Sequence, residues 1–167
     1  FNIVHGGQEA VQAICEHAEI KAITFVGSTK VAKIVYQRGT ANLKRVLALG
    51  GAKNHLIVLP DAHPEMAASN IAASMSGCAG QRCMAASTAV VVGGAQDAFI
   101  PPLEAATREI KVGPTDRDQD AGMGAVITRA HLARIEGLIG VAEKEGARIS
   151  VDGRGPKVQS AGRGGYL

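Results

Sequence analysis

The 167 residues include 18 Lys plus Arg and 15 Asp plus Glu, which gives a formal charge of +3 at pH 7. Apolar residues make up 46% of the chain and charged residues 20%, a composition that supports a buried core and excludes wholesale disorder. No apolar stretch is long enough to span a bilayer, which argues against a membrane protein. The small net charge, 3% aromatic content and absence of Trp argue against a nucleic-acid partner.

The three cysteines, Cys15, Cys78 and Cys83, are an odd number and do not form two spaced pairs. Neither a disulfide framework nor a four-thiolate zinc site can be built from them, and the histidines have no metal-ligand spacing. We therefore expect no metal and a reducing compartment, the cytoplasm or, in a eukaryote, the mitochondrial matrix.

Short apolar runs bounded by turn residues alternate with segments of helical spacing. The predicted strands are residues 1–4, 21–26, 46–49, 55–59 and 88–92. The predicted helices are residues 10–18, 31–35, 65–76, 96–109 and 127–145, with an interruption at Pro101 and Pro102 and with Thr128 as an N-cap. The Gly-rich segment 152–165 is predicted to be a loop. This alternation favours βαβ units and a mostly parallel sheet covered by helices, which is the α/β class.

Cys83 is the strongest candidate for a reactive residue, because it lies in a predicted loop between a helix and a Val-rich strand. The thiolate is the reactive form of cysteine, and a neighbouring cation such as Arg82 favours it. Cys15 lies among apolar residues of a predicted helix and is expected to be a small buried hydrophobe. Cys78 stays open between these two interpretations.

Residues 27–29, Gly-Ser-Thr, end a predicted strand and begin a helix. Backbone N–H groups and the helix dipole at such a turn favour an anion, so a phosphate could bind there. An ordinary turn with an N-cap explains the same residues, and the sequence contains no G-x-G-x-x-G motif.

Taken together, these segments are more specific than each one alone. Their order resembles the aldehyde dehydrogenase superfamily in residues 25–29 (Phe-Val-Gly-Ser-Thr), 47–51 (Leu-Ala-Leu-Gly-Gly) and 80–83 (Gly-Gln-Arg-Cys). Further likeness to the coenzyme A-acylating, methylmalonate-semialdehyde branch lies in residues 51–55 (Gly-Ala-Lys-Asn-His), 59–62 (Leu-Pro-Asp-Ala) and 80–85. The resemblance implies a parallel-sheet fold in which residues 1–49 end the NAD-binding domain and residues 50–167 form a truncated catalytic domain.

The resemblance also implies roles for individual residues. Cys83 matches the nucleophile that attacks the aldehyde, after which hydride leaves for NAD, and its backbone N–H would form half of the oxyanion hole. Gly27 and Ser28 match the turn that meets the cofactor pyrophosphate. Gly50 matches a backbone position close to the nicotinamide half.

Two side chains bear on the second half-reaction and on the substrate. Ala48 stands where hydrolytic members carry a Glu that activates water, and a methyl group can neither accept nor relay a proton; coenzyme A therefore becomes the expected acyl acceptor. The guanidinium of Arg82 could bind the carboxylate of an acidic semialdehyde, although a structural ion pair is the alternative.

The implied activity is the NAD-dependent oxidation of malonate or methylmalonate semialdehyde, with acyl transfer to coenzyme A that gives acetyl-CoA or propionyl-CoA and CO2. The implied assembly is a homo-oligomer, a dimer or a tetramer. Two alternatives remain: a hydrolytic aldehyde dehydrogenase whose base lies elsewhere, and a catalytically silent module that serves only in subunit contacts.

Overall fold

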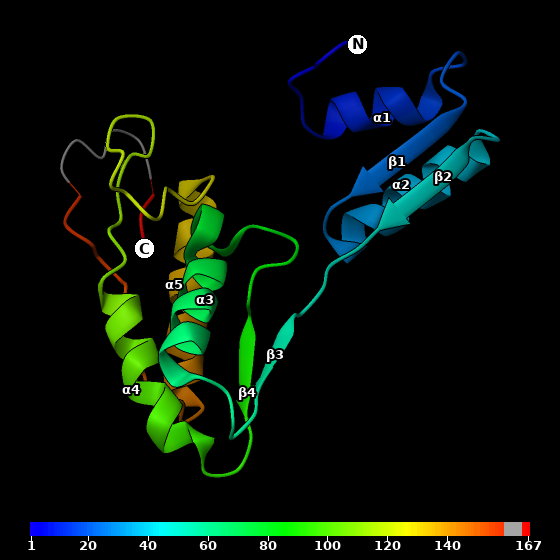
Figure 1. The fold of residues 1–167 in the computed structure, drawn as a ribbon. Coiled ribbons are helices and arrows are strands. Elements are labelled where there is room, and N and C mark those ends of the chain that lie inside the picture. Colours follow the sequence, from blue (N-terminus) through cyan, green and yellow to red (C-terminus); the bar gives the residue numbers. More distant parts are fainter. Residues whose placement is uncertain (159–164) are drawn as a thin grey trace. The chain divides into compact units, whose positions relative to one another are not determined.

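The structure is a computed structural model that describes residues 1–158 and 165–167. Its backbone contacts divide the chain into two compact units, Phe1–Ala52 and Lys53–Leu167, and each is described on its own (Figure 1). Helices and parallel strands follow one another in both units, so the predicted α/β class is confirmed. Within the described ranges, no helix combines the length and apolar character needed to cross a bilayer.

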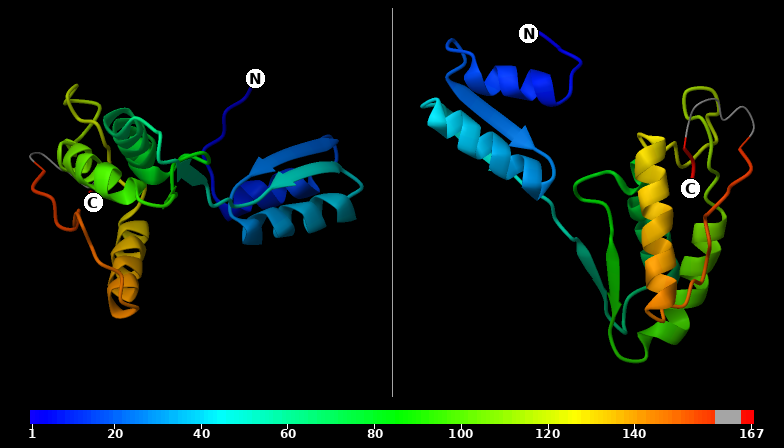
Figure 2. Two further views of the ribbon diagram at one scale, coloured as in Figure 1. Left: turned by 60° about the horizontal axis from the view of Figure 1, so that its bottom comes forward. Right: turned by 180° about the vertical axis from the view of Figure 1, so that it is seen from behind.

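The first unit is a parallel pair of strands with two helices. Its elements are α1 (Gln8–Glu16), β1 (Ala22–Val26), α2 (Thr29–Ala41) and β2 (Arg45–Leu49). The two strands are paired over their whole length, from Ala22 with Arg45 to Val26 with Leu49. Both helices lie on the same side of the strands (Figure 2). Cys15 of α1 is completely buried, so its predicted place in the core is confirmed.

Lys44 is a buried cation that fastens the end of α1 to the start of β2. Only 7% of the residue is exposed. Its Nζ donates hydrogen bonds to the carbonyl oxygens of His17 and Ile20, the latter at 2.6 Å. A cation at the C-terminal end of a helix also interacts favourably with the helix dipole.

The substitution Lys44→Met keeps the apolar stem of the side chain but leaves both carbonyl groups without their charged donor. We expect the free energy of unfolding to fall by about 2 kcal/mol. Urea denaturation followed by circular dichroism measures this loss. Lys21→Met is the matched control, because the Lys21 ammonium donates to the carbonyl of Ala18 at an exposed position and its removal should cost under about 0.5 kcal/mol. Equal losses in the two variants would contradict the prediction.

The second unit contains the other two strands and most of the helices. Its elements are β3 (His55–Val58), α3 (Pro64–Ser76), the 3-10 turn η1 (Gly77–Gly80), β4 (Thr88–Val91), α4 (Ala95–Arg108) and α5 (Arg129–Lys144). The strands β3 and β4 are parallel, and His55 pairs with Thr88. Helix α3 packs against α4, and the core between them and β3 is formed by Val58, Ala68, Ile71 and Phe99.

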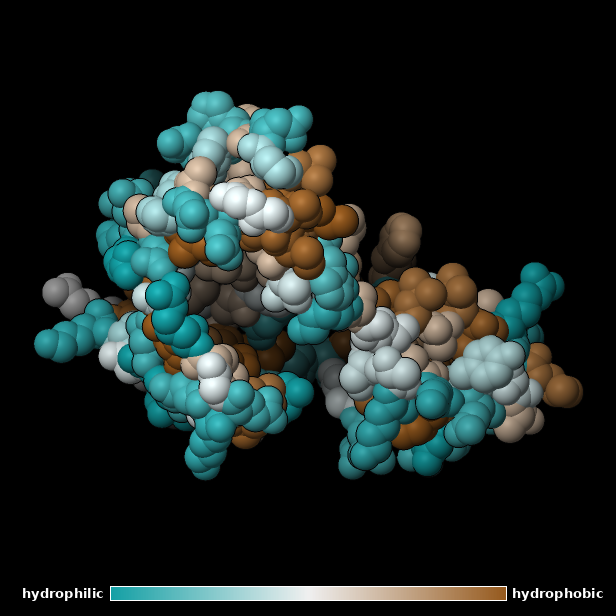
Figure 3. Space-filling view, turned by 90° about the horizontal axis from the view of Figure 1, so that it is seen from below, coloured by the Kyte–Doolittle hydropathy of each residue, from teal (hydrophilic) through white to brown (hydrophobic). Residues whose placement is uncertain are grey.

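Each pair of strands has apolar side chains exposed at the surface. In the first unit these include Leu47 and Leu49, and in the second Ile57, which is 68% exposed, and Val90. The surface view shows apolar patches on both units (Figure 3). Two paired strands are marginally stable by themselves, so the helices packed on them supply most of the burial.

Two predictions about local structure are wrong. Residues 1–4 form no strand: a strand exists through its hydrogen bonds to a neighbour, and in the described part of the chain this segment is paired with none. The expected interruption at Pro101 and Pro102 is also absent, because α4 continues through both prolines. Packing of α4 on α3, with Phe99 only 1% exposed, outweighs the loss of two backbone donors.

Other local predictions are confirmed. The Thr128 side chain accepts a hydrogen bond from the backbone N–H of His131 at 3.1 Å, as an N-cap does. Residues 152–158 form no helix or strand, and Gly165 forms an isolated bridge with Val126. Residues 159–164 of the predicted loop lie outside the described residues.

Arg154 holds the segment that follows α5 against that helix. Its guanidinium contacts Glu143 of α5 at 2.8 Å and donates from Nε to Asp152 at 2.9 Å. The hydrogen bonds from Arg154 lower the pKa of Asp152 from 3.8 to about 2. Because the folded-state pKa is lowered, this interaction stabilises the fold above about pH 4, and its contribution is lost as the pH falls toward 2.

Candidate functional site

Gly27, Ser28 and Gly50 come together at one edge of the first unit. The strands β1 and β2 are parallel and in register, so their carboxyl ends lie side by side, and the Gly27 N–H donates to the carbonyl of Leu49 at 3.1 Å. The Ser28 hydroxyl caps α2 by accepting a hydrogen bond from the Val31 N–H at 3.4 Å. The predicted cofactor residues of this unit therefore form a single cluster around the first turn of α2.

Gly50 lies so close to α2 that a side chain would not fit. A Cβ atom at this position would lie 2.8 Å from Oγ1 of Thr29 and 3.3 Å from its Cα. The Thr29 hydroxyl accepts a hydrogen bond from the backbone N–H of Gly51 at 3.0 Å. At Gly51 itself, the nearest atom to an added Cβ is the same oxygen at 3.6 Å, an ordinary contact.

An open groove of about 500 Å³ lies between α1 and α2. Its walls are mainly apolar and include Val11, Ile34 and Val35, whereas Lys30 and Arg38 supply two cations. The groove reaches Lys30 and Val31 in the first turn of α2, directly after the Ser28 cap.

Cys83 lies in the second unit, in a turn between η1 and β4, and is exposed. The entry to this turn has unusual backbone geometry, because Cys78 and Ala79 both have φ of +52° and Gly80 has φ of +71°. A left-handed conformation of a non-glycine residue costs about 1–2 kcal/mol, so contacts elsewhere must hold this turn.

Hydrogen bonds with three residues outside the turn, namely Ile127, Ser74 and Asn54, hold the segment that surrounds Cys83. The Gln81 side chain accepts a hydrogen bond from the Ile127 N–H, and Ser74 of α3 accepts one from the Ala86 N–H, both at 3.1 Å. Asn54, just before β3, donates to two carbonyl groups of the turn. Sequence reasoning assigned none of these contacts, although Asn54 and Gln81 lay within segments that it singled out, residues 51–55 and 80–85.

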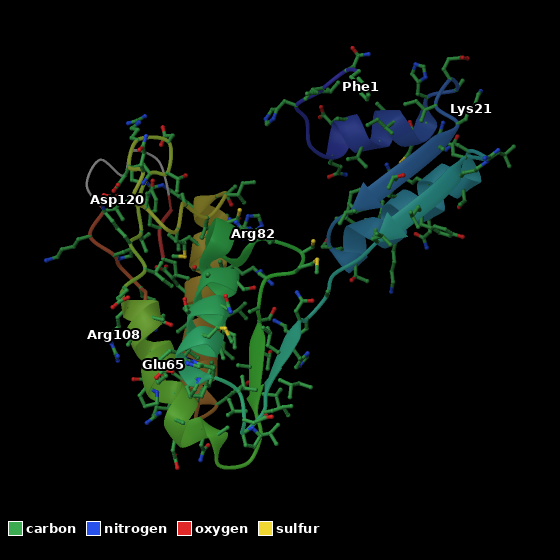
Figure 4. The ribbon with its side chains drawn as sticks, viewed as in Figure 1. Phe1, Lys21, Glu65, Arg82, Arg108 and Asp120 are labelled. Atoms are coloured by element: carbon green, nitrogen blue, oxygen red, sulfur yellow. The ribbon has the colours of Figure 1, made fainter. Side chains whose placement is uncertain are left out.

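Arg82 is directed to the end of α3 (Figure 4). Its Nε donates to the Cys78 sulfur at 3.4 Å, and its guanidinium packs so closely on Gly77 that a Cβ there would lie 2.5 Å from Nη1. Within the described residues Arg82 forms no ion pair with a carboxylate.

The Arg82 side chain lines a shallow cleft of about 520 Å³ between α3 and the segment after α4, together with Lys111 and Asp120. A hydrogen bond from Lys111 to Asp118 raises the pKa of the lysine and lowers that of the aspartate, so the pair stays charged near neutral pH. Among the described residues, no group of three His, Cys, Asp or Glu side chains could hold a metal ion.

The family model for aldehyde dehydrogenases matches residues 1–167. This chain belongs to the aldehyde dehydrogenase family. The predicted resemblance is thereby confirmed, although the chain spans only about a third of the length of the curated relatives it matches.

Three similar proteins illustrate where the chain lies within the family. It is 48% identical over 159 residues to malonate-semialdehyde dehydrogenase 1 of Bacillus licheniformis, covering 95% of this chain and 33% of that protein. It is 43% identical over 167 residues to the human mitochondrial enzyme named methylmalonate-semialdehyde/malonate-semialdehyde dehydrogenase [acylating]. This match covers 100% of this chain and 31% of the human protein. The structure also superimposes, with a TM-score of 0.91 at 41% identity, on a Sinorhizobium meliloti protein that is assigned as a methylmalonate-semialdehyde dehydrogenase and was solved in complex with NAD. This superposition covers 99% of this chain and 34% of that protein.

Proposed function

We propose that this chain is part of an NAD-dependent, coenzyme A-acylating dehydrogenase of malonate or methylmalonate semialdehyde, with Cys83 as its nucleophile. The observation that carries the proposal is the exposed thiol of Cys83 in a firmly held turn. The relatives named for these two substrates support the substrate class. On this proposal, residues 1–49 end the NAD-binding domain and residues 50–167 belong to the catalytic domain.

The geometry of the first unit fits NAD. The N–H groups and dipole at the start of α2 favour a pyrophosphate next to Gly27 and Ser28, and Lys30 adds a positive charge. The apolar groove between α1 and α2 offers walls suited to a flat heterocycle such as adenine. The missing side chain of Gly50 leaves backbone that a ligand can approach closely. When bound, NAD supplies the hydride acceptor.

The proposed reaction begins when the Cys83 thiolate adds to the aldehyde carbon and the carbonyl oxygen takes up negative charge. The backbone N–H of Cys83 stabilises that charge, and loss of hydride then converts the adduct into a thioester. The thiolate of coenzyme A attacks the thioester carbon, and the Cys83 thiolate leaves. The substrate carboxylate departs as CO2 and a proton replaces it, giving acetyl-CoA or propionyl-CoA.

Ala48 supports acyl transfer to coenzyme A in preference to hydrolysis. It lies in β2, half-buried, opposite Phe25 of β1. Its methyl group cannot deprotonate water, whereas a thiol with a pKa near 8.5 already supplies some thiolate at neutral pH. Coenzyme A therefore needs no general base at this position.

The first test is NADH formation by the full-length protein with malonate semialdehyde, with and without coenzyme A. We expect formation to depend on coenzyme A and to be lost in Cys83→Ala, because this variant lacks the thiolate that is proposed to attack the aldehyde. Cys78→Ala is the matched control, since it removes another exposed thiol that is not the proposed nucleophile, and NADH formation should persist and still depend on coenzyme A. NADH formation that is indifferent to coenzyme A would instead favour a hydrolytic enzyme.

The second test concerns Arg82 as the residue that selects acidic substrates. Arg82→Leu removes the proposed bidentate partner of the substrate carboxylate. We expect kcat/KM for malonate semialdehyde to fall by about 10- to 100-fold, the loss of one or two charge-assisted hydrogen bonds. The kcat/KM for propanal, which lacks a carboxylate, should change far less. Equal losses with both aldehydes would assign Arg82 a structural role.

The third test concerns the proposed NAD turn. In Gly50→Ala, the new methyl group must push Thr29 and the first turn of α2 away, because of the 2.8 Å and 3.3 Å contacts. Overpacking of this kind costs about 1–3 kcal/mol, so we expect the KM for NAD to rise about tenfold. Position 51 has room for the same methyl group, so Gly51→Ala should raise the KM for NAD less than about twofold. Steady-state kinetics with varied NAD distinguishes the two, and equal values would contradict the assignment.

A further inference from the structure

Asn54 makes two hydrogen bonds across to the turn that carries Cys83. Its side-chain nitrogen Nδ2 donates to the carbonyl oxygen of Cys83 and to that of Ala85, each at 2.9 Å. Both partners can only accept hydrogen bonds, so the NH2 group and not the oxygen of the carboxamide must face them. The two N–H bonds of this group are thus both used on one short segment of backbone.

These bonds complete the fixing of the backbone on both sides of Cys83. The peptide group before Cys83 is held through the carbonyl of Arg82, which accepts a hydrogen bond from the Ala85 N–H at 3.1 Å. The peptide group after Cys83 is held through its own carbonyl by Asn54. With both peptide groups fixed, the direction of the Cα–Cβ bond of Cys83 is fixed as well.

Asn54 is itself held firmly enough to serve as an anchor. Its backbone carbonyl accepts hydrogen bonds from the N–H groups of Ser87 and Thr88, at 3.3 Å and 3.1 Å. The next residue, His55, begins the parallel pairing with Thr88. The register of β3 with β4 therefore sets the position from which the Asn54 side chain reaches the turn.

We propose that Asn54 is a positioning residue for the Cys83 thiol. It acts through the backbone of the turn and not by contact with the substrate. The inference rests on the proposed role of Cys83 as nucleophile. Misplacing a reacting atom by about 1 Å can lower the reaction rate about 100-fold. Loss of a contact that fixes this backbone can therefore lower the rate strongly.

The test compares Asn54→Ala, Asn54→Asp and the control Asn42→Ala in the full-length protein. Asn42 also donates from Nδ2 to a backbone carbonyl, that of Arg38 at 2.9 Å, but at the end of α2. We expect Asn54→Ala to lower kcat by about 10- to 100-fold, with the KM for NAD changed less than about twofold. Asn42→Ala should leave kcat within about twofold of wild type.

Asn54→Asp is nearly the same shape but turns the donor into an acceptor. At pH 8 its carboxylate would face two carbonyl oxygens, so we expect a loss at least as large as in Asn54→Ala. Once protonated, the carboxyl can donate one hydrogen bond. The ratio of its kcat to that of wild type should therefore rise as the pH is lowered toward 5. A residue that merely fills space would give a constant ratio.

Hydrogen exchange measured by mass spectrometry reports on the anchor without any need for dehydrogenase activity. In Asn54→Ala the amides of residues 84–88 should exchange faster, whereas those of α4 should keep their wild-type rates. Unchanged exchange in residues 84–88, or faster exchange with an unchanged kcat, would overturn the proposal. If Asn54→Ala does not fold, Asn54→Ser retains one donor and should give an intermediate kcat, and a wild-type value would overturn the proposal.

Different results would refute the proposed function and the positioning role of Asn54. If wild-type protein forms no NADH with a semialdehyde, the proposed function fails. Alkylation of Cys83 by iodoacetamide, compared with that of Cys78 in the same sample, then still tests the positioning of the thiol. An equal ratio of the two rates in wild type and Asn54→Ala would overturn the role of Asn54 independently of catalysis.

Discussion

The parallel pairing of strands determines where every candidate residue lies. Parallel strands cannot be joined by a tight turn, so the chain must leave the sheet, form a helix and return. The connection between β3 and β4 contains α3 and then the turn with Cys83. The connection between β1 and β2 is α2, which begins at Thr29 and is capped by Ser28. In both units, some of the candidate residues therefore lie on the crossover, while the pairing of the strands fixes its two ends.

The two units use opposite ends of their strands. In the first, Gly27 and Gly50 follow the carboxyl ends of β1 and β2, where a helix N-terminus and open backbone favour an anionic ligand. In the second, Asn54 and the turn with Cys83 precede the amino ends of β3 and β4. At this end, side chains form hydrogen bonds with backbone groups that are not paired between the strands. The proposed binding edge and the proposed reactive turn thus both lie at the end of a parallel strand pair, the first at its carboxyl end and the second at its amino end.

Periodicity and turn residues predicted most helices and strands, because these depend on neighbours within a few positions. The completely buried Cys15 and the cap at Thr128 followed from local pattern alone. Residues 1–4 had the composition of a strand, but pairing depends on a partner elsewhere in the chain. The prolines of α4 had the composition of a break, but packing against α3 overrode it.

The site was predicted unevenly for the same reason. The turn at residues 27–29 and the loop position of Cys83 could be inferred locally. The direction of the Arg82 guanidinium, toward Cys78 and Gly77, depends on the left-handed backbone between them, which the sequence did not reveal. The bonds from Asn54 cross 29 and 31 positions of the chain, and no short motif records such a contact.

The left-handed conformation of Cys78 and Ala79 has a consequence for attempts to imitate the site. A free peptide with the sequence of residues 77–85 would abandon this conformation, since neither residue favours it without the surrounding contacts. Such a peptide would carry the thiol and the guanidinium but not their arrangement. The reactivity of the short segment in solution is therefore no guide to its reactivity in the folded chain, and small mimics of it would need a rigid scaffold.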